Sequence, residues 1–122
     1  MEEYPPEYYQ FFISFNSEDF YMCHDLLEDI WMSDKGNLFI KGLLQMCVGL
    51  YHYSYGNLKG ATSMLNVAQE YLNSYRPYYW NLDVDQVLEH IKECLAIIPA
   101  AGEKRTTIKE LPALPTLHIY LR

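Results

Sequence analysis

The sequence has 122 residues, enough for one domain with a single core, since a fold of this size buries roughly two-thirds of the surface its unfolded chain exposes. Half of the residues are hydrophobic and 16% are aromatic, which excludes a disordered chain. The formal net charge is -7, which repels a phosphate backbone and excludes nucleic acid as a partner.

Periodicity of apolar residues predicts an all-α fold, a single-domain antiparallel helical bundle of about five helices. The predicted helices cover about residues 6–15, 18–32, 38–55, 58–74 and 84–98. Residues 1–99 are then the bundle domain, and residues 100–122 are an extended, proline-containing tail, because its prolines exclude a regular helix. We expect this tail either to pack along the bundle or to remain mobile.

Capping residues punctuate these helices. Ser17, Asn37, Asn57 and Asp83 are predicted N-caps, and Gly56 is a predicted C-terminal cap. The last helix is expected to stop at Pro99 because proline lacks a backbone N–H. The aromatic loop of residues 78–80 is expected to be either a lid over the core or an exposed patch for a partner.

Three cysteines bear on the cellular compartment. Cys23, Cys47 and Cys94 lie within helical patterns and show no CxxC spacing, so we expect buried thiols rather than disulfides or zinc ligands. Such thiols are typical of a reducing environment. The N-terminus lacks the basic and apolar regions of a secretory signal. We therefore expect a cytoplasmic protein.

The most apolar run covers residues 38–55 and is long enough to span a bilayer. It contains Lys41, Gln45 and His52 together with two glycines. These residues favour a buried central helix over a membrane span, so we expect no membrane partner.

Two polar stripes stand out in this otherwise apolar chain. One lies on a single face of the second predicted helix, at spacing i, i+4, i+7, and consists of His24, Glu28 and Trp31. The other consists of small and polar residues of the third predicted helix, Gly42, Gln45, Gly49 and His52. We expect the two stripes to face each other, with the glycines leaving room for the polar side chains.

A turn centred near residue 35 or 36 sets the register between these helices. His24 and Glu28 would then flank Gln45, while His52 would lie roughly 7 to 8 Å further along the helix.

Three interpretations of the stripes remain open. The first is a buried hydrogen-bond network or small-ligand site formed by His24, Glu28, Trp31, Gln45, His52 and Asn57. The second is a metal site with His24, Glu28 and His52 as ligands and water in the open position, as hydrolytic zinc or manganese chemistry requires. The third is plain exposure to solvent.

Four carboxylates give the second helix an acidic face. They are Glu18, Asp19, Asp25 and Asp29. Such a face is either simply solvated or a surface that meets a basic partner.

Two phrases carry a family resemblance, FNSEDFYMCHDLLEDIW and FIKGLLQMCVGLYHYSYGNLKGATSML. They closely resemble the bacterial DUF309 family, whose members share F-N-x-x-x-F-x-x-x-H-E-x-L-E-x-x-W followed by G-L-x-Q and H-x-x-x-x-N-x-x-G-A. The resemblance covers roughly residues 11–75 and implies a small all-α bundle. Two positions depart from the family pattern, Asp25 where Glu is usual and Cys47 where Ala is common.

The resemblance also implies which positions the family shares. They are Phe15, Asn16, Phe20, His24, Leu27, Glu28, Trp31, Gly42, Leu43, Gln45, His52, Asn57, Gly60 and Ala61. Some members have been labelled metal-dependent hydrolases, but the family carries no established reaction.

Two functional hypotheses follow. The first is a non-catalytic module that binds a protein partner, a second copy of itself or a small ligand, with no cofactor. The second is a metal-dependent hydrolase that uses a divalent metal held by His24, Glu28 and His52, with Gln45 orienting substrate or water. Catalytic residues beyond this set are not indicated by any motif.

Overall fold

The computed structural model describes residues 3–102 and 111–122. The all-α prediction is confirmed, since the described part contains five α-helices, a short 3-10 helix and a two-stranded hairpin. The α-helices are α1 (Pro6–Asn16), α2 (Phe20–Ser33), α3 (Leu38–Ser54), α4 (Leu58–Leu72) and α5 (Val84–Gly102). The 3-10 helix η1 covers Asn73–Tyr75 and follows α4 directly in the chain.

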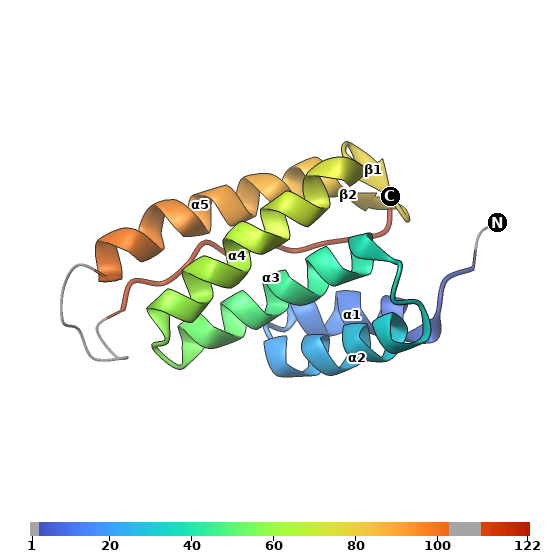
Figure 1. The fold of residues 1–122 in the computed structure, drawn as a ribbon, viewed down its shortest axis with the longest axis horizontal. Helices are drawn as coiled ribbons and strands as arrows, with labels where there is room; N and C mark the ends of the chain where they lie inside the picture. The colour runs from blue at the N-terminus through green and yellow to red at the C-terminus, as the bar shows by residue number, and fades with distance from the viewer. Residues whose placement is uncertain (1–2, 103–110) are drawn as a thin grey trace.

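The α3 helix is the centre of the bundle. It packs against α2 on one side and against α4 on the other, while α1 lies on α2 and α5 lies on α4 (Figure 1). The core is therefore shared among all five helices. The α2 helix lies at the outer edge of this arrangement, so one of its long sides has no helix packed against it (Figure 1).

The predicted cap of α2 is wrong by two residues. Asp19, not Ser17, is the N-cap, and its side chain accepts a hydrogen bond from the Met22 N–H. Ser17 is instead the C-cap of α1, and its N–H donates a hydrogen bond to the Ile13 carbonyl oxygen. Glu18 turns the chain with a positive φ of 58°, which places it between the two helices.

The other predicted caps are confirmed. The side chains of Asn37, Asn57 and Asp83 each accept a hydrogen bond from the backbone N–H three residues later, at 3.0 to 3.1 Å. Gly56 has a positive φ of 77°, the conformation that ends a helix at low cost when the residue is glycine.

The aromatic loop is a β-hairpin that covers the end of the core. Strand β1 (Tyr78–Tyr79) pairs with β2 (Leu82–Asp83) through Trp80 and Asn81, which both have positive φ as a two-residue turn requires. The Trp80 ring stacks on Tyr4 at 4.9 Å between centroids, and the Tyr8 hydroxyl donates to the Trp80 carbonyl oxygen. Trp80 therefore acts as a lid over the end of the core, whereas Tyr78 and Tyr79 of the same loop are exposed, at 59% and 41%.

The last helix runs further than predicted, because α5 passes Pro99 and ends at Gly102. A proline inside a helix removes one hydrogen bond and strains the preceding turn, which can bend a helix without ending it. The predicted tail from residue 100 is therefore helical at its start. Its residues 103–110 lie outside the described part of the chain.

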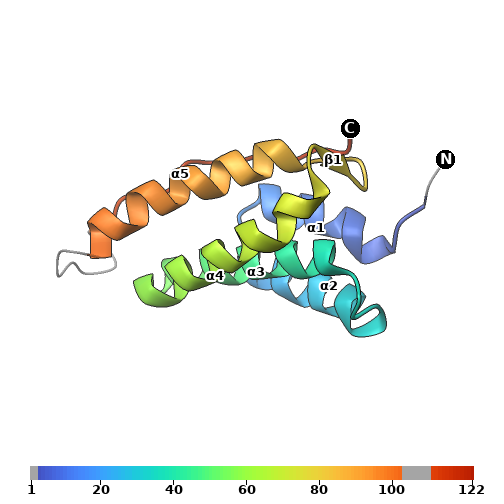
Figure 2. The ribbon, with the colours of Figure 1, turned by 45° about the horizontal axis from the view of Figure 1, so that its top comes forward.

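Residues 111–122 are extended and run back along the bundle beside α5 (Figures 1 and 2). Asn16 holds them with two bonds, as its side chain accepts from the Ile119 N–H and donates to the Ile119 carbonyl oxygen. Ile119 is fully buried. Of the two behaviours expected for the tail, the described part packs along the bundle.

The predicted buried thiols are confirmed, because Cys23, Cys47 and Cys94 are buried and unpaired. Among the helices of the described ranges, none has the length and apolar character needed to cross a membrane.

Candidate functional site

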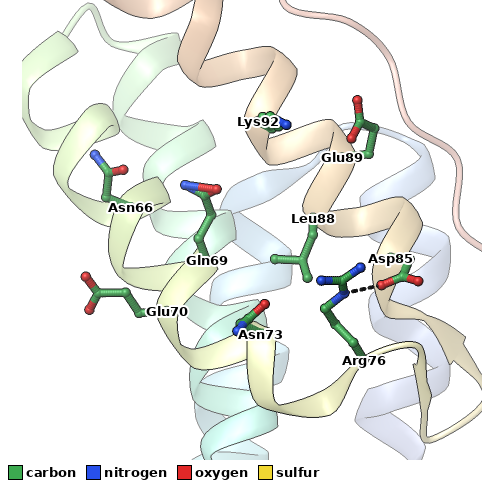
Figure 3. A pocket seen from close by; sticks show the side chains of 9 residues that line it. All are labelled: Asn66, Gln69, Glu70, Asn73, Arg76, Asp85, Leu88, Glu89 and Lys92. Carbon is green, nitrogen blue, oxygen red and sulfur yellow. Dashed lines mark hydrogen bonds and ion pairs between the residues drawn. The ribbon is translucent and has the colours of Figure 1, made fainter.

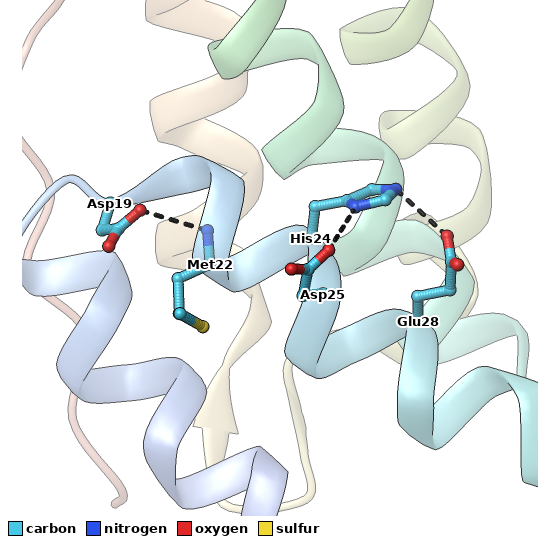
Figure 4. Close-up of polar contacts among 5 residues, drawn as sticks. All are labelled: Asp19, Met22, His24, Asp25 and Glu28. Carbon is cyan, nitrogen blue, oxygen red and sulfur yellow. Dashed lines mark hydrogen bonds and ion pairs between the residues drawn. The ribbon is translucent and has the colours of Figure 1, made fainter.

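The predicted pair on α2 lies on the surface. His24 Nε2 is 3.1 Å from Glu28 Oε2, and His24 Nδ1 is 3.4 Å from Asp25 Oδ1, so one ring joins two carboxylates (Figure 4). The side chains of His24 and Glu28 are 34% and 48% exposed. The prediction of a buried network is therefore wrong for this pair, because the buried side of α2 is formed by Cys23, Leu27 and other apolar residues.

A second pair lies apart from the first, at the turn between α3 and α4. The side-chain amide of Asn57 is 3.2 Å from His52 Nδ1. The same Asn57 side chain caps α4. His52 thus helps to hold a helix cap.

The register between α2 and α3 agrees with the prediction. Lys41 Nζ lies 4.2 Å from the centre of the Trp31 ring, and the Tyr21 and Tyr51 rings are 5.5 Å apart. Both pairs are symmetric about Gly36, within the predicted turn. The Tyr51 hydroxyl donates to that of Tyr55, a bond that raises the pKa of Tyr51 from its ordinary value of 10 to about 12.

The expectation that the two stripes face each other is wrong. A Cβ added at Gly42 would lie 2.8 Å from Leu72 Cγ, and one added at Gly49 would lie 2.9 Å from Leu65 Cγ. The two glycines therefore make room for leucines of α4, not for polar groups of α2.

The small residues of α4 divide between two roles. Ala61 is fully buried, and its carbonyl oxygen is 3.2 Å from a Cβ built on Gly49. Gly60 instead accommodates the capping side chain of Asn57. Gln45, which lies between Gly42 and Gly49 in the sequence of α3, is half-buried.

The proposed metal ligands do not form a group. In the described ranges, 3–102 and 111–122, no three His, Cys, Asp or Glu side chains are placed so that they could hold a metal ion. His24 and Glu28 form a pair, but His52 is not joined to them in a three-ligand set. A catalytic zinc site uses three protein ligands, so the hydrolase hypothesis gains no support from this geometry.

Trp31 closes the α2–α3 interface at one end. Its indole Nε1 is buried and has no hydrogen-bond partner among the described residues. Lys41 covers the ring face at 4.2 Å, and Lys35 lies further away at 5.7 Å. The ammonium groups of the two lysines thus lie over the face of the Trp31 ring, and the indole N–H at the edge of the ring is buried.

The exposed side of α2 combines carboxylates with large apolar side chains. We call this side the outer face of α2 and define it as Tyr21, Met22, Asp25, Glu28, Asp29 and Met32, all exposed. Sequence reasoning identified two of the carboxylates as an acidic face but missed the tyrosine and the methionines beside them. The signal was present, since these six residues recur on the side of the helix opposite its buried positions.

The charge around this face has one sign. None of the nine Lys and Arg residues precedes Lys35, whereas nine of the sixteen acidic residues do. The α1–α2 half of the bundle is therefore strongly acidic, and the outer face of α2 contains no Lys or Arg.

A polar groove of about 710 Å³ lies between α4 and α5 (Figure 3). The ion pair of Arg76 and Asp85 crosses one end of it, and Lys92 and Glu89 lie along its α5 side. Because the groove offers both signs of charge, it favours no one kind of ligand by electrostatics.

Comparison with known proteins finds a family match for about the first half of the chain. Residues 8–64 match the family model described as "Domain of unknown function (DUF309)", which confirms the resemblance predicted from the sequence. The chain is also 32% identical over 66 residues to the "Uncharacterized protein YpuF" of Bacillus subtilis (strain 168). That alignment covers 51% of this chain and 38% of the relative. No solved structure matches the chain.

Proposed function

Residues 8–64 match the DUF309 family model, and we propose that this region is a protein-interaction module whose outer face of α2 binds a basic, amphipathic segment of a partner protein. The observation that supports this proposal is the combination of three carboxylates with tyrosine and methionine side chains, all of them exposed on one side of α2.

The acidic groups set the charge of the partner. Asp25, Glu28 and Asp29 are exposed along one side of α2, and no Lys or Arg in the first 34 residues competes for them. Opposite charge across an interface increases the association rate and selects the partner more than it adds affinity. A Lys- or Arg-rich segment is thus the complement of this face.

The apolar groups set the shape of the partner. Tyr21 and Met32 are 55% and 56% exposed, and Met22 lies beside them on the same side of α2. Methionine is flexible and polarizable, and it is common at surfaces that receive amphipathic helices. The partner segment should therefore carry an apolar stripe beside its basic residues.

A binding experiment with defined peptides tests the proposal. The probe is a fluorescein-labelled amphipathic peptide of leucine and lysine, and its control is the same pattern with glutamate in place of lysine. Fluorescence anisotropy should show binding of the lysine peptide alone, weakened by added salt because exposed charges are screened. Equal binding of the glutamate peptide would contradict the proposal.

Matched variants then locate the binding surface. Asp25→Asn with Asp29→Asn should weaken binding of the lysine peptide about tenfold, because each exposed ion pair contributes up to about 1 kcal/mol. Glu89→Gln with Glu93→Gln on α5 changes the net charge by the same amount on exposed residues elsewhere and should leave binding nearly unchanged. Equal weakening by both variants would show that only net charge matters.

A further inference from the structure

A second cavity, independent of the outer face of α2, lies beneath the extended tail. Its volume is about 330 Å³, at the lower end of the roughly 300–1,000 Å³ found for small-molecule sites. Its walls come from the end of α1, the start of α2, the end of α3, α5 and the tail. The apolar part of the lining includes Phe15, Phe20, Leu50, Leu114 and Leu117.

The tail is a fixed wall of this cavity. Residues 113–117 line it, and they are held on both sides. The Tyr53 hydroxyl donates to the Pro112 carbonyl oxygen, and Asn16 makes its two bonds to Ile119. The cavity is thus formed before a ligand arrives, which lowers the cost of ordering on binding.

The charge of the described lining is negative. Among the described residues around the cavity, Glu18 is the one carboxylate, and none is Lys or Arg. Glu18 lines the cavity and is exposed, so this residue lies at the side where the cavity meets solvent. Glu18 forms no ion pair with any residue that the structure describes.

His90 supplies a buried polar group inside. It is only 7% exposed, and its Nε2 lies 3.5 Å from the Sγ of Cys94. Burial lowers the pKa of His90 below its ordinary value of 6.5, which keeps the ring neutral at neutral pH. The described residues that line the cavity therefore place no positive charge against a bound cation.

We propose that this cavity binds a small organic cation with an apolar body, an arylalkyl or alkyl amine, whose ammonium group lies at Glu18 and whose apolar part lies between Phe15, Phe20 and the tail leucines. An apolar pocket with a single carboxylate at its mouth attracts an ammonium group and repels a carboxylate, and aromatic faces such as those of phenylalanine also attract cations.

Three compounds with the same phenyl body test the charge requirement. Phenethylamine, phenethyl alcohol and hydrocinnamate are titrated into isotopically labelled full-length protein, and NMR shift changes are followed. Phenethylamine should shift the signals of Phe15, His90 and Leu114 and bind about threefold to fivefold more tightly than the alcohol, while hydrocinnamate should leave these signals unchanged. Equal binding of the amine and the acid, or shifts confined to other residues, would overturn the proposal.

Variants then separate the charge from the cavity itself. E18Q should reduce the affinity for phenethylamine to that for phenethyl alcohol. Leu114→Trp, which fills the cavity from the tail, should abolish binding of both compounds, and Leu121→Trp, on an exposed residue of the same segment outside the lining, should not. Unchanged amine binding in either E18Q or Leu114→Trp would refute the site, provided that circular dichroism shows a folded helical protein.

Discussion

The two long sides of α3 use polar and small residues for opposite purposes. Toward α4, Gly42 and Gly49 remove side chains so that Leu72 and Leu65 come within van der Waals contact of the helix backbone. Toward α2, Lys41 reaches over an aromatic ring at an interface that ends at the surface. On α3, the glycines therefore mark the side where a neighbouring helix packs closest, whereas the polar side chain of Lys41 marks the edge of the contact with α2.

The largest expected effect is at the α4 side. Gly49→Val should lower the free energy of unfolding by about 2 kcal/mol or more, because the added atoms meet Leu65 and the backbone oxygen of Ala61 in a packed interface. The better helix propensity of valine offsets only a fraction of this cost. Urea denaturation followed by circular dichroism measures the change.

A second glycine provides the control for this experiment. A Cβ built on Gly36 meets nothing within 4 Å, so Gly36→Ala should change the free energy of unfolding by less than about 0.5 kcal/mol. If Gly49→Val proves as mild as Gly36→Ala, the α3–α4 seam is not the close contact described above.

Sequence reasoning captured most of the fold because caps and periodicity are local signals. Asn37, Asn57 and Asp83 could be identified as caps because each acts on a backbone N–H only three residues away. The register of α2 against α3 could be estimated because a short turn leaves little freedom between them. The hairpin was missed because its turn residues, Trp80 and Asn81, are not one of the Asn-Gly, Asp-Gly or Gly-Gly pairs that usually mark such a turn.

The site was harder to predict than the fold. Spacing alone placed His24 and Glu28 on one face of α2, which is correct, but it could not say whether that face was covered. Whether the polar residues of α2 are covered depends on which side of α3 faces α2 and which side faces α4. The packing of Leu65 and Leu72 of α4 against Gly42 and Gly49 decides this. Such a contact between distant residues has no local signature in the sequence.

A smaller effect is expected on the α2 side of α3. Lys41→Met should lower the free energy of unfolding by about 0.5 to 1 kcal/mol, because it removes a cation from the face of Trp31 at a partly exposed site. Lys35→Met alters the net charge equally, but its ammonium lies 5.7 Å from the ring, so its effect should be smaller. Urea denaturation of both variants checks this order, and the reverse order would show that the ring contact does not stabilise the interface.

The smallest effect is expected on the outer face of α2. Glu28→Gln removes the i, i+4 contact with His24, and because both side chains are more than one-third exposed, the free energy of unfolding should fall by only about 0.3 kcal/mol. Asp29→Asn, on the same face, is the control, since Asp29 makes no ion pair among the described residues. Thermal melts in low and high salt measure both variants. A loss above about 1 kcal/mol for Glu28→Gln would mean that this face is held as firmly as the α3–α4 seam. A small loss would mean that its carboxylates add little to the fold and are available to a partner.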